Sequence, residues 1–206
     1  ISDNVRGALI TMPHKVRTVA LLDDASPAVH VAGACNAVRR DARGRLVGEQ
    51  FDGAGFVRGI QRKGFDVRGC TALVVGAGGV CCAIDASLAG AGVGALRLID
   101  ENAALAEQLR ERLALHHSAI QVSTCSRDPR GCDLVVNATP LGMNDGDPLP
   151  FDVSLLSAST FVGEVVMRRE VTPVLAAAQA RGCRVQVGTD MLFEQIPAYL
   201  EFFGFP

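Results

Sequence analysis

Short apolar runs alternate with helix-forming stretches through the last two thirds of the chain. The clearest run, residues 72–75, is entered from Thr71 and leads through Gly76-Ala77-Gly78-Gly79 into a small, apolar segment of helical character. Further strands are predicted at residues 95–100, 121–125, 133–139, 160–167 and 183–188. Helices are predicted at residues 103–115, 172–181 and 191–203. Strands separated by helices predict an α/β fold with a doubly wound parallel sheet.

The first sixty residues carry a separate pattern. The stretch AVHVAGACNAV, residues 28–38, has the apolar content of strands, and a helix is predicted at residues 53–63 after the turn-prone Phe51-Asp52-Gly53. A linker is expected at residues 62–69. The chain is therefore predicted to form two unequal parts with a cleft between them, which is a common place for a ligand.

Composition and charge exclude several classes of function. Hydrophobic residues make up 49% and charged residues 20% of the chain, as in ordinary globular proteins. A net charge of -2 gives no general attraction to nucleic acid or to anionic lipid. Neither a signal-peptide pattern nor an apolar run of roughly 18 residues is present, so a cytoplasmic location without membrane contact is expected.

The seven cysteines do not form a recognisable ligand or disulfide pattern. Their number is odd, and no two of them have CxxC spacing. Reduced, mostly buried thiols are therefore expected, and no metal site is predicted.

The glycine-rich turn after the first strand of the predicted sheet has the features of a dinucleotide-binding loop. Gly76 would permit the tight turn, Gly78 would let a pyrophosphate approach the backbone, and Gly79 and Val80 would begin a helix with free N–H groups. The third glycine of the usual motif is replaced by Cys81, which is also small. A tight turn with no ligand is the alternative interpretation.

Asp100 strengthens the dinucleotide interpretation. It ends the next predicted strand, about 24 residues after Gly76, where an acidic residue is expected to bind the adenine ribose hydroxyls. Glu101 follows it, and two carboxylates would repel a 2′-phosphate, so NAD is predicted in preference to NADP. The alternative is that Asp100 caps the following helix.

The chain holds only two lysines, Lys15 and Lys63, and the first ends the segment ITMPHK. Seven ordered segments, this one included, resemble the shikimate/quinate dehydrogenase family over essentially the whole chain: ITMPHK (10–15), GACNAV (33–38), GEQFDGAGF (48–56), VVGAGGV (74–80), NATPLGM (137–143), VTPVLAAAQARG (171–182) and GTDMLFEQ (188–195).

The resemblance implies NAD(P)-dependent hydride transfer at a ring alcohol, between 3-dehydroshikimate and shikimate or the quinate equivalents. The catalytic pair of the family corresponds to Lys15 and Asp52. A lysine amine can move a proton and a carboxylate can hold it in place, whereas arginine does not release a proton at a usable pH.

The resemblance also implies domains and binding residues. Residues 1–63 and 190–206 would form the substrate-binding and catalytic domain, incomplete at its N-terminus, and residues 64–189 the NAD(P)-binding Rossmann domain. The cyclic hydroxy acid would be bound by Thr11, Asn36, Gln195 and the position of Met167. Besides the glycine turn and Asp100, the cofactor would be bound by Asn137, Thr139, Met143, Gly188 and Met191.

Three departures from the family pattern change the expectation. Phe51 replaces a small hydroxyl residue beside Asp52, and Met167 replaces a tyrosine near the substrate carboxylate. Only nine residues precede ITMPHK, without the leading strand–helix–strand unit and its Ser-x-Ser motif, so a longer physiological protein is expected. We therefore predict a divergent shikimate dehydrogenase-like member with altered substrate recognition.

Two alternatives stay open at this level. One is a weak or inactive dinucleotide-binding regulatory homologue, and the other is an enzyme for aminoshikimate or an unrelated ring alcohol. Monomer and homodimer are both compatible with the sequence.

Overall fold

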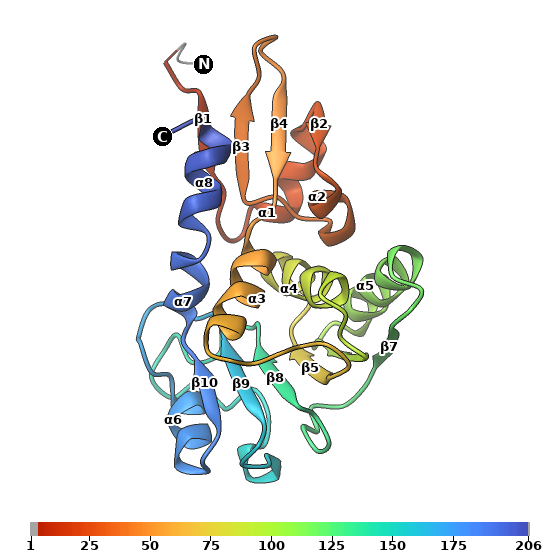
Figure 1. The fold of residues 1–206 in the computed structure, drawn as a ribbon, viewed down its shortest axis with the longest axis vertical. Helices are drawn as coiled ribbons and strands as arrows, with labels where there is room; N and C mark the ends of the chain where they lie inside the picture. Colours follow the sequence, from red (N-terminus) through yellow and green to blue (C-terminus); the bar gives the residue numbers. More distant parts are fainter. Residues whose placement is uncertain (1–3, 206) are drawn as a thin grey trace.

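The computed structural model describes residues 4–205, which form a four-stranded and a six-stranded sheet connected by helices (Figure 1). The larger sheet is parallel, in the order β10-β9-β8-β5-β6-β7, which is the usual order of dinucleotide-binding doubly wound folds. Its strands are β5 (Thr71–Val75), β6 (Ala95–Ile99), β7 (Gln121–Thr124), β8 (Leu134–Asn137), β9 (Phe161–Glu164) and β10 (Arg184–Gln186). The predicted fold class is confirmed.

Helices cover both faces of this sheet because its central strands are apolar on both sides. One apolar core joins α4 (Gly79–Gly90) and α5 (Ala103–His116) to the sheet and includes Ile84, Leu88, Leu96, Leu98 and Leu109. A second core lies under α6 (Pro173–Ala180) and the short η2 (Val153–Leu155), and it includes Leu73, Val135, Val162, Val174 and Leu175.

The smaller sheet has the order β1-β3-β4-β2 and is mixed. β3 (Ala37–Arg40) pairs antiparallel with β1 (Gly7–Leu9) and with β4 (Leu46–Glu49), whereas β2 (Asp24–Ala25) is parallel to β4. The short helices α1 (Lys15–Thr18) and η1 (Val19–Leu21) lie between β1 and β2 in the chain.

The stretch of residues 28–38, expected as strand, contains a helix. Its first half belongs to α2 (Pro27–Ala32), and only its end enters β3. The side chain of Ser26 accepts a hydrogen bond from Val29 N, and Pro27 occupies the first turn, which together start a helix. Gly33 ends it in the left-handed region at φ 63°. The capping residues therefore produced a helix here, although the apolar and β-branched residues favour a strand.

The predicted closing helix is two helices, α7 (Gly188–Phe193) and α8 (Ile196–Phe203). Pro197 lies in the first turn of α8 and has no N–H to continue a helical ladder, so the helix restarts there, with Gln195 at the N-cap. Figure 1 shows α8 alongside β1, and a Cβ built on Gly7 would lie 2.5 Å from the ring of Phe203.

The smaller sheet region is held against the larger one by contacts of α3 (Asp52–Arg62) and of α2. Helix α3 packs on α4 so closely that a Cβ on Gly53 would lie 1.9 Å from the carbonyl oxygen of Ala83. Arg112 of α5 donates to the carbonyl oxygens of Val31 at 2.8 Å and Ala32 at 3.1 Å, at the C-terminal end of α2. The arginine thereby satisfies carbonyl groups that the helix end leaves without partners.

Between residues 4 and 205, no helix is both long and apolar enough to cross a membrane. Each of the seven cysteines is a free thiol.

Candidate active site

Lys15 and Asp52 are in direct contact, although they come from different helices. Lys15 is the first residue of α1, and Asp52 is the first residue of α3. The Lys15 Nζ donates to Asp52 Oδ2 at 2.7 Å, with 11% of the lysine side chain and 5% of the aspartate side chain exposed. The backbone N–H of Asp52 donates to the Oε1 of Gln50 at 2.8 Å, which fixes the start of α3.

This pair lies beside the beginning of α4. A Cβ built on Gly79 would lie 3.1 Å from the Cβ of Lys15 and 3.4 Å from the Cβ of Ala34. The carbonyl oxygen of Lys15 accepts a hydrogen bond from Cys35 N at 2.9 Å. The lysine is thus fixed between Asp52 and the glycine turn, at the carboxyl ends of the parallel strands where ligands bind in such sheets.

The glycine turn has the open backbone that a pyrophosphate needs. Gly76 has φ 122°, and a Cβ there would lie 2.9 Å from the carbonyl oxygen of Ala138. Gly78 is the N-cap of α4 and provides no side-chain cap, and a Cβ there would meet no atom within 4 Å. The N-terminal N–H groups of α4 are therefore left for an anionic ligand, so these residues fit a bound dinucleotide.

Asp100 is held against the same turn. Its Oδ2 accepts from Ala77 N at 2.6 Å and its Oδ1 accepts from Asn102 N at 2.8 Å. The N-cap of α5 is Asn102, whose side chain accepts from Ala104 N, so the alternative interpretation of Asp100 as the helix cap is wrong. Sequence reasoning missed Arg127, which donates to Glu101 at 3.1 Å and lies distant in the chain.

The end of β8 is organised by a buried carboxylate. Asn137 Nδ2 donates to both carboxylate oxygens of Glu164, at 3.0 and 3.1 Å, and to Leu141 O at 2.9 Å. Thr139 Oγ1 donates to Asn137 Oδ1 at 2.6 Å. Burial raises the pKa of Glu164, while hydrogen bonds from Val166 N, Asn137 and other donors oppose that shift. The predicted residues Asn137 and Thr139 therefore form one rigid loop.

The remaining predicted cofactor residues lie around that loop or on α7. Gly188 begins α7, and a Cβ there would lie 2.3 Å from the carbonyl oxygen of Val166, so only glycine allows this approach. Met191 on the same helix is buried, and Met143 is half-buried.

Asn36 and Gln195, two of the predicted substrate ligands, meet in a buried hydrogen-bonded cluster. Asn36 Nδ2 donates to Gln195 Oε1 at 3.1 Å and to the Tyr199 hydroxyl at 2.8 Å. Its Oδ1 accepts from Phe51 N at 2.9 Å, one residue before Asp52. Sequence reasoning missed Tyr199, although its spacing of four residues from Gln195 places both on one face of a helix.

Thr11 and Met167 lie outside this cluster. Thr11 is exposed in the turn before α1, where its carbonyl oxygen accepts from His14 N at 2.9 Å. Met167 follows β9 and is 48% exposed. Within the part of the chain that the structure describes, no group of His, Cys, Asp and Glu side chains could hold a metal ion.

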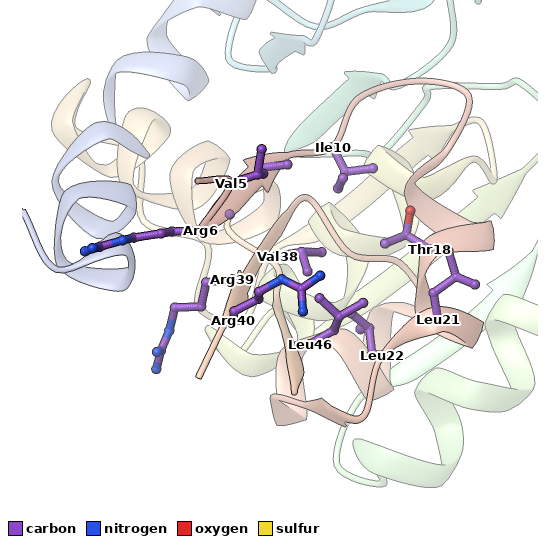
Figure 2. A pocket seen from close by; sticks show the side chains of 12 residues that line it. Val5, Arg6, Ile10, Thr18, Leu21, Leu22, Val38, Arg39, Arg40 and Leu46 are labelled. Carbon is purple, nitrogen blue, oxygen red and sulfur yellow. The ribbon is translucent and has the colours of Figure 1, made fainter. Parts of the chain in front are cut away.

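A groove of about 250 Å³ opens beside the smaller sheet (Figure 2). Its apolar walls come from β1, η1, β3 and their neighbours and include Val5, Ile10, Leu21, Leu22, Val38 and Leu46. The residues that line it do not include Lys15, Asp52, Asn36 or Gln195, so the groove is distinct from the candidate active site.

Comparisons with known proteins identify the family of the chain. Residues 1–38 match the family model described as the shikimate dehydrogenase substrate binding domain. A shikimate dehydrogenase (NADP(+)) of Rubrobacter xylanophilus is 39% identical over 194 residues, covering 92% of this chain and 68% of that protein.

The similarity to solved structures extends over nearly the whole chain. The quinate dehydrogenase of Corynebacterium glutamicum in complex with NAD is 33% identical, with a TM-score of 0.87, covering 97% of this chain and 73% of the other. The shikimate 5-dehydrogenase of Thermus thermophilus in complex with NADP(H) and shikimate is 30% identical, with a TM-score of 0.86 and coverages of 98% and 74%. The chain belongs to the shikimate dehydrogenase family.

Proposed function

We propose that this protein is an NAD(P)-dependent dehydrogenase that interconverts a ring hydroxyl and a ketone of shikimate, quinate or a related cyclic hydroxy acid. The observation that carries the proposal is the placement of Lys15. Its Nζ lies 2.7 Å from Asp52, and its Cβ lies 3.1 Å from the position of a Cβ on Gly79, at the start of α4. The residues proposed for proton transfer therefore lie close to the glycine turn proposed for dinucleotide binding.

When the ketone is reduced, the Lys15 ammonium would donate a proton to the ketone oxygen, and when the hydroxyl is oxidised the neutral Lys15 amine would accept that proton. An ammonium group has three hydrogens, and the contact with Asp52 uses one of them, which leaves the others for a substrate oxygen. Asp52 would hold the amine in position, because its own helix start is fixed by Gln50. Proton transfer by a positioned side chain typically contributes about 10²- to 10⁴-fold in rate.

A nicotinamide dinucleotide, when bound, supplies the hydride acceptor or donor for this chemistry. The residues that would hold it are the glycine turn with Val80, Asp100 at the adenine ribose, and Asn137, Thr139, Met143, Gly188 and Met191 near the nicotinamide. The carboxylate of Glu164 accepts hydrogen bonds from Asn137 Nδ2 and so holds the Asn137 amide in one orientation.

NAD is the proposed preference. Asp100 is fixed at the turn by Ala77 N, and its charge with that of Glu101 disfavours a 2′-phosphate. Arg127 offsets the charge of Glu101 in part. The quinate dehydrogenase structure contains NAD, whereas the Rubrobacter relative is named for NADP(+) and gives no support to this preference.

The substrate and the cofactor are proposed to bind to different domains, each built around one of the two sheets. Residues 1–63 and 190–206 would bind the substrate, and residues 64–189 would bind the cofactor. The Asn36–Gln195 contact supports this division, because it joins the two ends of the chain in one cluster. Phe51 beside Asp52 and Met167 in place of a tyrosine support a substrate preference that differs from that of typical members.

A screen of shikimate, quinate and related cyclic hydroxy acids with NAD and NADP, followed by the absorbance of the reduced cofactor, tests the proposal. We expect turnover of at least one acid and a loss of about 100-fold or more in Lys15→Ala. An absence of turnover with every acid would favour a regulatory dinucleotide-binding homologue. Unchanged turnover in Lys15→Ala would refute the assigned chemistry.

A further inference from the structure

The only tyrosine of the chain, Tyr199, is fixed next to the candidate active site. It lies on α8 and is half-buried. Its ring meets the ring of Phe51 edge to face, with centroids 5.2 Å apart and planes at 83°. Phe51 also contacts Phe202 in the same manner, at 5.7 Å. Because Phe51 directly precedes Asp52, the aromatic contact ties α8 to the start of the helix that carries the carboxylate.

The hydroxyl of Tyr199 joins the two predicted substrate amides. It accepts from Asn36 Nδ2 at 2.8 Å and donates to Gln195 Oε1. Asn36 Nδ2 gives its other hydrogen to the same Gln195 Oε1 at 3.1 Å. Gln195 Nε2 donates to Met191 O at 3.2 Å. The three side chains therefore form a closed hydrogen-bonded triangle.

Among the described residues, the hydrogen-bonded triangle leaves one amide donor and one amide acceptor without a partner, and both are available to a ligand. Both hydrogens of the Asn36 amide and both lone pairs of Gln195 Oε1 are used. One hydrogen of Gln195 Nε2 and one lone pair of Asn36 Oδ1 remain. Tyr199 thus fixes each amide in a single orientation, in which Gln195 offers a donor and Asn36 offers an acceptor.

The hydroxyl is also electrostatically close to Asp52. Burial first, and the negative charge of Asp52 second, raise the pKa of Tyr199, so the phenol stays a hydrogen-bond donor at neutral pH. No other tyrosine could take over this role, and Phe202, three residues further along α8, has no hydroxyl.

We propose that Tyr199 is a positioning residue for the ring substrate, which orients the Asn36 and Gln195 amides toward the hydroxyl groups of a cyclic hydroxy acid held at Lys15 and Asp52. This inference rests on the proposed function. It assigns a role to Tyr199, which contacts both predicted substrate ligands. The Tyr199 ring also packs on Phe51, next to the proposed catalytic Asp52.

The variant Tyr199→Phe tests the proposal because it removes only the hydroxyl and keeps the ring against Phe51. Shikimate and quinate are each titrated by calorimetry into protein saturated with reduced cofactor, so that no turnover occurs. We expect the Kd of the bound acid to rise about tenfold, because two buried amides lose a partner, while the Kd of the cofactor changes less than about twofold. If turnover is measurable, KM should rise with little change in kcat.

Glu201→Gln, an exposed substitution on the same helix, is the matched control and should change neither Kd. An unchanged acid Kd in Tyr199→Phe would overturn the inference. A parallel loss of acid affinity, cofactor affinity and melting temperature would also overturn it, since that pattern indicates a purely structural residue. A wild-type protein that binds neither acid overturns it as well. Binding without turnover would refute the proposed function and still allow this test.

Discussion

Lys15 Nζ lies 2.7 Å from Asp52 Oδ2 across a separation of 37 positions in the chain, and both side chains are largely removed from solvent. The pair sits where the smaller sheet region meets the first turn of α4. The proposed chemistry depends on a group that both carries charge and releases a proton.

The variant Lys15→Arg separates these two properties. Arginine keeps the positive charge and the ion pair with Asp52, but its guanidinium does not release a proton at neutral pH. We expect kcat to fall by about 100-fold or more while the melting temperature changes little. The other lysine supplies the control: Lys63→Arg, which retains the pairing with Asp190, should keep turnover. Wild-type rates in Lys15→Arg would contradict a proton-transfer role.

Glu101→Gln tests the basis of cofactor choice. The glutamate pairs with Arg127 at 3.1 Å, so neutralising it removes one repulsive charge and frees the Arg127 guanidinium from this ion pair. We expect the ratio of kcat/KM for NADP to that for NAD to rise by about two- to fivefold, as for an exposed charge. Glu111→Gln, which neutralises a glutamate on α5, is the matched control for this ratio. A wild-type protein that already prefers NADP would show that the Asp100 argument is wrong.

Two glycine substitutions should separate packing from ligand binding. Gly53→Ala would place a Cβ 1.9 Å from Ala83 O and force α3 away from α4, so we expect a loss of about 3 kcal/mol in the free energy of unfolding. Gly78→Ala meets no atom within 4 Å and should leave stability nearly unchanged. It should instead weaken cofactor binding by roughly tenfold, or about 1.4 kcal/mol, because the Cβ occupies the approach to the backbone.

Denaturant titrations and calorimetric cofactor titrations measure the two effects separately. The reverse pattern, with Gly78→Ala unfolding the protein and Gly53→Ala tolerated, would be incompatible with the packing of α3 on α4 and with a dinucleotide at the glycine turn.

Asp85 should make stability fall as pH rises. It is fully buried in α4, its Oδ1 has no hydrogen-bond partner among the described residues, and its Oδ2 accepts from Cys81 Sγ at 3.3 Å. Burial raises the pKa of Asp85 to about 8. The folded protein therefore keeps a proton that the unfolded chain releases above about pH 4. The contribution of protonated Asp85 to the free energy of unfolding is complete below about pH 4. It decreases by up to about 1.4 kcal/mol per pH unit as the pH rises toward 8.

Thermal unfolding at pH 5 and pH 8 measures this dependence. We expect the decrease in melting temperature between the two values to become smaller in Asp85→Asn, because the amide does not titrate. Asp66→Asn serves as the control. The hydrogen bond from Arg68 lowers the pKa of Asp66 to about 2, so its stabilisation is already complete above pH 4 and constant over this range. An identical decrease in Asp85→Asn and wild type would contradict the assignment.

The parallel strands and the helices between them were predictable because they depend on local patterns. The run at residues 71–75, the glycine turn and the helix from Ala103 were placed correctly, since burial on both faces and good helix formers are visible within ten to fifteen residues. The expectation failed at residues 28–38 and at the closing helix. In those places Ser26 with Pro27, and then Pro197, decided where helices begin.

The candidate site divides in the same way. The glycine turn and Asp100 were proposed as cofactor residues from spacing, and the lysine–aspartate pair was proposed from the family resemblance. Tyr199 and Arg127 could not be found, because their partners are distant in sequence: 163 positions separate Tyr199 from Asn36, and 26 separate Arg127 from Glu101.

The sequence by itself determined most strands and helices of the larger sheet, and which residue types are available for proton transfer and phosphate binding. Only the tertiary structure decided that α3 packs on α4 and that α8 returns to β1. These packings bring together side chains from the two ends of the chain. Backbone preference and hydrophobic periodicity act over a few residues, whereas the partners of a buried polar group are chosen by which elements share a core.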